Sequence, residues 1–347
     1  MKTGDPMDLS AELDATVRAL AHPGKGVLAA DESGGTIAKR FATIGVDSTE
    51  ENRRQYRQLL VSTPGLGEFV SGVILYAETL AQQGDDGTPL AQIAARQGIV
   101  PGIKVDAGKL PLAGSPGDEI TEGLDGLAKR LEGYKAQGAR FAKWRAVYNV
   151  SDRLPGRAAI VANAEALARY AAICQAAGVV PIVEPEVLFD GDHAQARCAE
   201  VTEAALHAVF HALHRHHVVL EQMLLKPNMV VAGKECTPQA TVAEVAAQTL
   251  RVLRRTVPAA VPAIVFLSGG QTPPQATAHL DAMNRAGAQP WRLNFSYGRA
   301  LQEPVLKAWR GEAANVAAAQ QALLHRARLN AAATQGRYDA AMENASA

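Results

Sequence analysis

The stretch Glu221-Gln-Met-Leu-Leu-Lys-Pro-Asn-Met-Val230 has the pattern of an apolar β-strand that ends in a lysine, Lys226. An ammonium group at the end of a buried strand costs free energy unless it is paired or neutral. Other apolar runs end in the same way, and the charged residues at their ends are Asp31, Lys104, Asp106, Lys143, Arg145, Glu184 and Glu186. Charges gathered at strand ends predict an active site at the mouth of a barrel, with one lysine as a candidate nucleophile.

Short apolar runs alternate with longer amphipathic stretches along the chain. The strand-like runs cover residues 26–31, 70–78, 100–106, 140–145, 179–187, 221–229, 263–270 and 291–298. The helix-like stretches between them include residues 49–61, 123–137, 157–177, 193–217, 237–256 and 272–285. Eight strands that alternate with helices predict an α/β fold of the (β/α)8 TIM-barrel type. A doubly wound parallel sheet is the alternative, because strand order is not visible in a sequence.

Two further helical stretches, at residues 9–21 and 313–333, predict an extra helix at each end of the barrel. The 48% hydrophobic content supports a large core, and no low-complexity linker interrupts the chain. Residues 1–347 are therefore predicted to form a single domain. The final residues, 339–347, are mostly small and polar, which predicts a mobile C-terminal tail.

The composition gives no sign of a nucleic-acid or membrane partner. Lys and Arg together number 35, as do Asp and Glu, so no net charge attracts a polyanion. The three cysteines are sparse and widely spaced, which indicates reduced thiols in a cytoplasmic protein. The first twenty residues contain acids and no apolar segment of a signal peptide, and no run reaches membrane-spanning length. His207, His211 and His214 share a helix face, where a solvated face or subunit contact is favoured over a metal site.

The charged strand ends suit carbonyl chemistry. Residues two apart on a strand share a face, so Lys143 lies beside Arg145 and Glu184 beside Glu186. Nearby cations and burial lower the pKa of a lysine, and a neutral lysine attacks a carbonyl to form a Schiff base. Glutamates close by can then transfer protons. A structural ion-pair network is the alternative, but charges at the ends of several strands favour an active site.

Two glycine-containing turns predict a phosphate site. Leu267-Ser-Gly-Gly-Gln271 lies at the end of the seventh predicted strand, and Phe295-Ser-Tyr-Gly-Arg299 at the end of the eighth. Loops at these places bind phosphate in many barrels, because glycines let backbone amides approach the anion. Ser33-Gly-Gly-Thr36, together with Lys104, is a candidate for a second anion site. Two such sites on either side of a lysine suit a bisphosphorylated sugar.

Taken together, these segments resemble class I fructose-bisphosphate aldolase, the metal-free Schiff-base family. The resemblance runs from about residue 20 to residue 338, and its strings include Leu28-Ala-Ala-Asp-Glu-Ser33, Gly102-Ile-Lys-Val-Asp106, Phe141-Ala-Lys-Trp-Arg145, Val180-Pro-Ile-Val-Glu-Pro-Glu186 and Leu224-Leu-Lys-Pro-Asn-Met229. It implies a lyase that reversibly cleaves fructose 1,6-bisphosphate to dihydroxyacetone phosphate and glyceraldehyde 3-phosphate. It also implies a cytoplasmic homotetramer in glycolysis and gluconeogenesis, without a metal or other cofactor.

The resemblance assigns a role to each site residue. Lys226 matches the Schiff-base lysine, Glu184 the acid/base of imine formation, and Glu186 a neighbour that orients the lysine. Asp31 and Lys143 match the residues around the bond that is cleaved, with Arg145 beside them. One phosphate site is matched by Ser268, Gly269, Gly298 and Arg299, and the other by Ser33, Thr36 and Lys104.

The C-terminus departs from the family pattern. Animal relatives end in a tyrosine on a flexible tail that assists proton transfer at the enamine, whereas this chain ends Met342-Glu-Asn-Ala-Ser-Ala347. Its last tyrosine is Tyr338, so that step is expected to proceed differently here. A transaldolase-like Schiff-base transferase and a non-enzymatic barrel scaffold are the alternatives. The first needs no paired phosphate sites, and the second would be expected to have lost the lysine or a glutamate.

Overall fold

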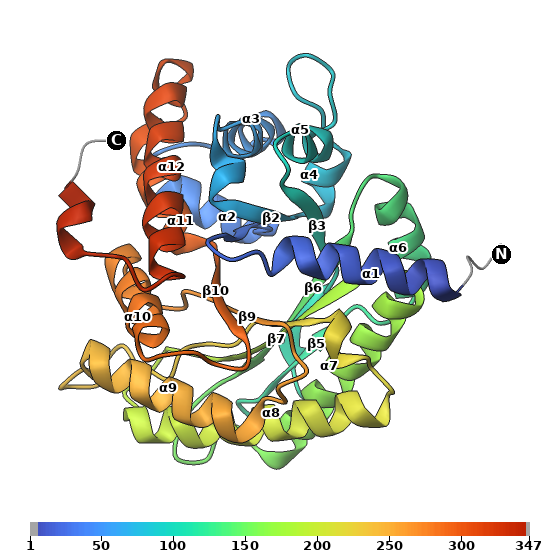
Figure 1. Cartoon of the computed structure of the whole chain (residues 1–347), viewed down its shortest axis with the longest axis vertical. Helices are drawn as coiled ribbons and strands as arrows, with labels where there is room; N and C mark the ends of the chain where they lie inside the picture. The colour runs from blue at the N-terminus through green and yellow to red at the C-terminus, as the bar shows by residue number, and fades with distance from the viewer. Residues whose placement is uncertain (1–5, 345–347) are drawn as a thin grey trace.

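The computed structural model describes residues 6–344 and contains a closed parallel barrel (Figure 1). Its strands follow the order β1-β10-β9-β8-β7-β6-β3-β2 around the barrel. Their bounds are Gly26–Ala30 (β1), Val70–Leu75 (β2), Val100–Lys104 (β3), Phe141–Tyr148 (β6), Val180–Val187 (β7), Leu224–Leu225 (β8), Ala263–Phe266 (β9) and Arg292–Tyr297 (β10). The predicted TIM barrel is confirmed, and closure excludes the doubly wound sheet.

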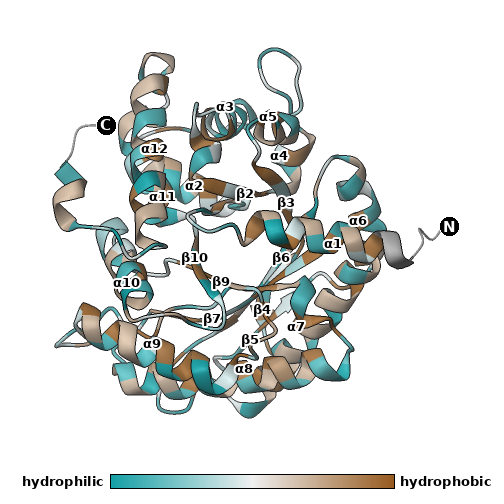
Figure 2. Ribbon diagram, viewed as in Figure 1, coloured by the Kyte–Doolittle hydropathy of each residue, from teal (hydrophilic) through white to brown (hydrophobic). Residues whose placement is uncertain are grey.

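Helices surround the barrel (Figure 1). They are α1 (Pro6–Leu20), α2 (Gly34–Ala42), α3 (Glu50–Val61), α4 (Ala77–Ala81), α5 (Leu90–Arg96), α6 (Leu127–Ala136), α7 (Arg157–Ala176), α8 (Gln195–Arg215), α9 (Val242–Thr256), α10 (Pro273–Arg285), α11 (Arg299–Trp309) and α12 (Val316–Ala333). Apolar side chains fill the layer between strands and helices, while hydrophilic residues are frequent on the outer turns (Figure 2). Trp144 packs in this layer against Tyr170 of α7.

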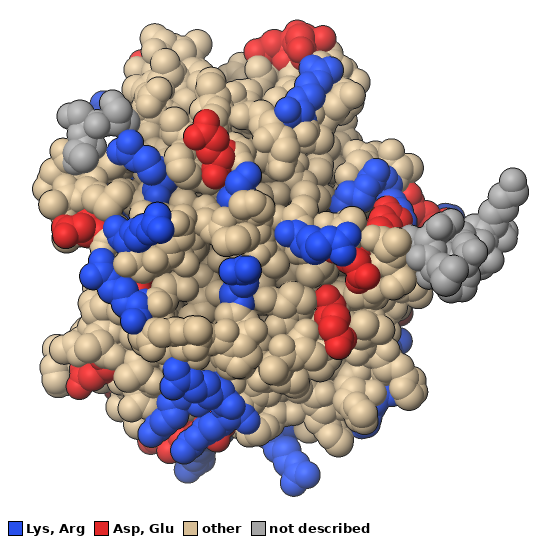
Figure 3. All heavy atoms as spheres, in the orientation of Figure 1, with Lys and Arg blue, Asp and Glu red and all other residues tan. Residues whose placement is uncertain are grey.

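The barrel interior changes from apolar to charged along the strands. At the amino-terminal end, side chains such as Val27, Ile74, Ile182 and Val265 form a buried cluster that includes residues of α1. Phe141 belongs to this cluster and packs directly against Gly102, where a Cβ would lie 2.3 Å from its ring. On the face that α1 crosses, cationic and acidic side chains form small separate groups (Figure 3). One end of the barrel is thus plugged with apolar side chains, and the charged end is left for a site.

Several local predictions were wrong in extent. Of the predicted strand 221–229, only Leu224–Leu225 pairs with its neighbours, and Leu220–Gln222 forms a 3-10 turn. The helix predicted over 237–256 begins at Val242, because Thr241 and Glu244 form a capping box. An unpredicted antiparallel hairpin joins β4 (Gly108–Pro111) to β5 (Glu119–Glu122).

The C-terminal segment returns to the outside of the barrel. Ala340–Asn344 form a 3-10 helix, η4, in which Glu343 pairs with Arg326 of α12 at 2.5 Å. Tyr338 Oη donates a hydrogen bond to the other carboxylate oxygen of Glu343 at 2.8 Å. The predicted mobility of 339–347 remains a prediction, and residues 345–347 lie outside the described part of the chain.

Candidate active site

A cavity of about 550 Å³ opens at the carboxyl end of the barrel strands. All the site residues predicted from the sequence line it, namely Asp31, Ser33, Thr36, Lys104, Lys143, Arg145, Glu184, Glu186, Lys226, Ser268, Gly269, Gly298 and Arg299. They come from distant parts of the chain and meet because parallel barrel strands all end on the same side.

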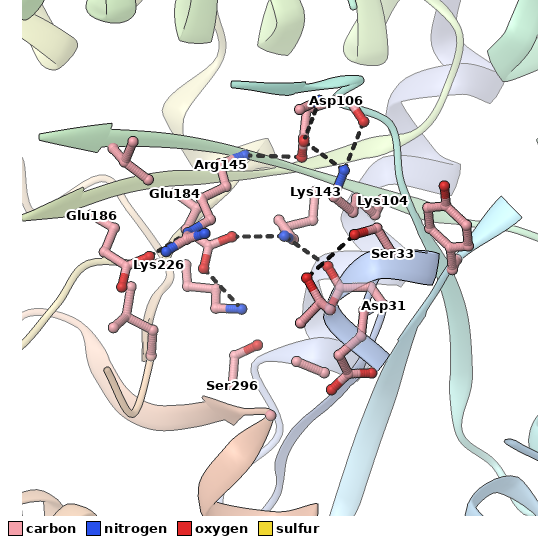
Figure 4. A pocket seen from close by; sticks show the side chains of 18 of the residues that line it. Asp31, Ser33, Lys104, Asp106, Lys143, Arg145, Glu184, Glu186, Lys226 and Ser296 are labelled. Carbon is pink, nitrogen blue, oxygen red and sulfur yellow. Dashed lines mark hydrogen bonds and ion pairs between the residues drawn. The ribbon is translucent and has the colours of Figure 1, made fainter. Parts of the chain in front are cut away.

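A line of alternating charges crosses the floor of the cavity (Figure 4). Lys226 Nζ lies 3.1 Å from Glu184 Oε1, and Lys143 Nζ lies 3.0 Å from Glu184 Oε2. Lys143 Nζ also lies 2.7 Å from Asp31 Oδ2. The side chains of Lys226, Glu184 and Lys143 are each 4% exposed. Two carboxylates therefore alternate with two amines in a nearly dry space.

Burial and charge oppose each other in this line. Burial disfavours the ionised form of Asp31, but Lys143 and Lys226 outweigh it and hold the pKa of this carboxyl well below its usual range. The same balance of burial against Lys143 and Lys226 lowers the pKa of Glu184. For Lys143, burial favours the neutral amine, yet Asp31 and Glu184 prevail and raise its pKa. At neutral pH, Lys143 is a fixed cation between two carboxylates.

Two further ion pairs border this line. Arg145 Nε donates to Glu186 Oε2, and Lys104 Nζ lies 2.6 Å from Asp106 Oδ1. Asp106 Oδ2 also accepts a hydrogen bond from the backbone amide of Arg145 at 3.4 Å. Asp106 thereby connects β3 to β6.

The loop after β9, Ser268-Gly-Gly-Gln271, has the features of an anion site. Arg299 Nη2 donates to the carbonyls of Gly269 and Gln271, at 3.1 Å each. Gly269 has a φ of 53°, which glycine adopts without strain. Within residues 6–344, the amides of Ser268, Gly269 and Gly270 donate no hydrogen bond, so they are available to a phosphate.

The second predicted anion site begins at the N-terminus of α2. The hydroxyls of Ser33 and Thr36 lie 3.3 Å apart and line the cavity together with Lys104. Ser33 is the N-cap residue of α2, but its side chain makes no capping hydrogen bond. Its hydroxyl is therefore not committed to the helix.

Sequence reasoning missed several residues that line the cavity, among them Glu32, Arg40, Tyr76, Thr121 and Ser296. Arg40 of α2 pairs with Glu32, and its place four residues after Thr36 could have pointed to it. Ser296 Oγ is buried without a partner among the described residues. Ser296 lies within β10, where the alternation of inward and outward side chains could have identified it.

Other functional readings receive no support within residues 6–344. In this range, no group of three His, Cys, Asp or Glu side chains is placed to hold a metal ion. The histidines of α8 therefore do not form such a group. None of the helices in this range has the length and hydrophobicity that crossing a membrane requires.

Comparisons with known proteins agree on one family. The family model for fructose-bisphosphate aldolase class-I matches residues 12–347. A probable fructose-bisphosphate aldolase class 1 of Xanthomonas campestris is 55% identical over 328 residues, which cover 94% of this chain and 98% of that protein. The fructose-bisphosphate aldolase of Drosophila melanogaster is 54% identical over 336 residues, covering 95% and 92% respectively. The structure of the Plasmodium falciparum fructose-bisphosphate aldolase, in complex with TRAP and a small-molecule inhibitor, superimposes with a TM-score of 0.94 at 50% identity and covers 96% of both chains.

Proposed function

The chain belongs to the class I fructose-bisphosphate aldolase family of lyases, and we propose which of its residues perform each step of the reaction. In this reaction, fructose 1,6-bisphosphate is cleaved through a lysine Schiff base. The observation that carries the proposal is the buried line Lys226–Glu184–Lys143–Asp31, with contacts of 3.1, 3.0 and 2.7 Å. Family membership also sets aside the transaldolase-like and scaffold alternatives.

Lys226 is the proposed nucleophile. Its neutral amine attacks the C2 carbonyl of the sugar to give a carbinolamine, and Glu184 is the carboxylate in contact with its Nζ. Glu184 moves the proton that the nitrogen loses to the C2 oxygen, which becomes the carbinolamine hydroxyl. A second proton, taken from solvent through Glu184, lets this hydroxyl leave as water and gives the protonated imine. Glu186, hydrogen-bonded to Arg145, fixes the adjacent wall of the cavity.

Asp31 and Lys143 are proposed to act on the bond that breaks. Asp31 is ionised and accepts the C4 hydroxyl proton as the C3–C4 electron pair moves into the protonated imine. This step releases glyceraldehyde 3-phosphate and leaves an enamine on Lys226. Lys143 stays cationic and holds both Asp31 and Glu184 in place. A proton then returns to C3, and water hydrolyses the imine to release dihydroxyacetone phosphate.

The two phosphates are proposed to bind at opposite sides of the cavity. Ser268, Gly269, Gly298 and Arg299 hold one, and Ser33, Thr36 and Lys104 hold the other, each set lining the same cavity. Free backbone amides and cationic side chains suit the dianion. Two sites that flank one lysine favour a bisphosphorylated ketose.

Borohydride trapping tests the assignment. With dihydroxyacetone phosphate present, borohydride should inactivate the enzyme and add mass to the peptide that contains Lys226. Lys226→Met should abolish both trapping and cleavage, whereas Lys234→Met, at an exposed lysine paired with Asp190, should leave both intact. A label found only on another lysine would reject the role of Lys226. Chelator should not change activity, and loss of activity that Zn²⁺ restores would contradict metal independence.

The assembly and the location are also proposals. The family resemblance supports a cytoplasmic homotetramer. Light scattering at micromolar concentration should give four times the mass of the 36.6 kDa chain, and a monomer would refute the assembly.

A further inference from the structure

A buried polar relay reaches the phosphate-binding loop after β9 from the middle of α10. His279 Nδ1 lies 2.5 Å from Gln271 Oε1, and Gln271 Nε2 donates to the carbonyl of Ser268 at 3.0 Å. Ser268 and Gln271 are 5% exposed, and His279 is 6% exposed. Neither His279 nor Gln271 lines the cavity itself.

The contacts determine the direction of every proton in the relay. The Ser268 carbonyl accepts only, so the group of Gln271 that faces it is the NH₂ group. The oxygen of the Gln271 amide therefore faces His279, which must donate from Nδ1–H. Burial lowers the pKa of His279 to about 4, so the ring is neutral at physiological pH.

This relay holds the end of the loop that lies next to the nucleophile. The Ser268 carbonyl also accepts from the Gln271 amide at 3.2 Å, and the Leu267 amide donates to the Pro227 carbonyl, one residue after Lys226. At the far end of the loop, Arg299 holds two carbonyls, and a Cβ on Gly270 would lie 1.6 Å from Phe189. With its carbonyls held, the loop keeps the amides of Ser268, Gly269 and Gly270 free for an anion.

We propose that His279 is a positioning residue for phosphate binding, which acts by orienting Gln271 and, through it, Ser268. The proposal rests on the assignment of Ser268 and Gly269 to a phosphate site. Without the donor of His279, the buried oxygen of Gln271 has no partner, and the amide turns away or moves to find one. The loop then loses its prearranged geometry, and phosphate binding weakens while the chemistry at Lys226 does not change.

The test uses two substitutions of nearly the same shape. His279→Asn keeps an NH₂ donor where Nδ1 stood, and His279→Leu removes it. We expect His279→Leu to raise the KM for fructose 1,6-bisphosphate about tenfold with kcat within about threefold of wild type, and His279→Asn to restore most of the KM. Both variants leave a similar space at α10. Their melting temperatures therefore report the loss of fold stability separately from the change in KM. His211→Leu, at an exposed histidine of α8, is the control.

Dihydroxyacetone, which has no phosphate, separates binding from chemistry. Borohydride trapping of dihydroxyacetone on Lys226 should proceed alike in wild type, His279→Leu and His279→Asn. Gln271→Met provides a second variant, with the same expected rise in KM, should His279→Leu fail to fold. Equal KM values for the Leu and Asn variants, or an unchanged KM in Gln271→Met, would overturn the proposal. Absence of both cleavage and trapping in the wild type would instead refute the proposed function.

Discussion

Lys226 Nζ lies 3.1 Å from one carboxylate oxygen of Glu184, and the other oxygen lies 3.0 Å from Lys143 Nζ. The Glu184 carboxylate therefore contacts two amines at once. Glu184 is thus the only carboxylate among the described residues that pairs with both lysines. Removal of its charge affects the nucleophile directly and also changes the surroundings of Lys143.

Glu184→Gln should lower the rate of cleavage by about 10²- to 10⁴-fold, because the amide fills the same space but cannot carry the proton of imine formation. The rate of borohydride trapping with dihydroxyacetone phosphate should fall in parallel. Glu165→Gln, at a partly exposed glutamate of the outer helix α7 that pairs with Arg215 and His216, is the matched control and should behave as wild type. Trapping at the wild-type rate in Glu184→Gln would assign the proton transfer to another group.

Arg299→Ala should weaken binding of phosphorylated substrate by roughly 1.5–3 kcal/mol, the cost of losing charge-assisted hydrogen bonds. Arg299 also holds the carbonyls of Gly269 and Gln271, so its loss releases the loop as well as the charge. Arg299→Lys should recover part of this binding, since it keeps the charge without the planar fork. Steady-state kinetics of all three proteins will decide, and an unchanged KM and kcat in Arg299→Ala would place Arg299 away from the phosphate.

The folded protein should lose stability in mild acid through His279. Burial lowers its folded-state pKa from 6.5 to about 4, so the unfolded chain binds the proton more readily. The contribution of neutral His279 to the free energy of unfolding is therefore fully present above pH 6.5 and decreases as the pH falls. It is lost at about pH 4, and the whole contribution amounts to roughly 3 kcal/mol. Urea unfolding from pH 7.5 to 4 should show this decrease in wild type relative to His279→Asn. Parallel curves for the two proteins would contradict it.

The charged residues at the strand ends were predictable because each one follows an apolar segment that is continuous in the sequence. Apolar segments that end in Asp31, Lys143, Glu184 or Lys226 need burial for the segment and a partner for the charge. A barrel meets both needs, since it brings all the strand ends together. The site residues could therefore be predicted from the sequence without knowledge of strand order.

The pairings themselves could not be predicted, because they depend on tertiary distances. Nothing in the sequence indicates that Glu184 lies between Lys226 and Lys143, or that His279 contacts Gln271. The β4–β5 hairpin was missed because its strands are only four residues each, bury only Thr121 and show no clear apolar period. The start of α9 was predicted at residue 237, but the capping box of Thr241 and Glu244 determines where the helix begins.

The C-terminal segment should matter more for stability than for catalysis. Arg326 is 4% exposed and pairs with Glu343 at 2.5 Å, while its Nη2 donates to the Pro273 carbonyl at 3.0 Å. Glu343→Gln leaves this buried cation without its carboxylate and should lower the free energy of unfolding by about 1–3 kcal/mol. Glu303→Gln breaks an exposed pair with Lys307 and should cost less than about 0.5 kcal/mol.

Cleavage should tolerate complete removal of residues 340–347. The segment offers no tyrosine, and its described part contacts Arg326 and Tyr338 on the outside of the barrel. Truncation should therefore change the cleavage of fructose 1,6-bisphosphate by less than about threefold, under 1 kcal/mol of barrier, at a temperature where the protein stays folded. Exchange of the dihydroxyacetone phosphate proton with solvent should be equally insensitive. A tenfold fall in either rate, with Glu343→Gln still fully active, would show that the tail reaches the cavity during turnover. If both variants lost activity in step with their melting temperatures, the tail would be acting on the fold through Arg326.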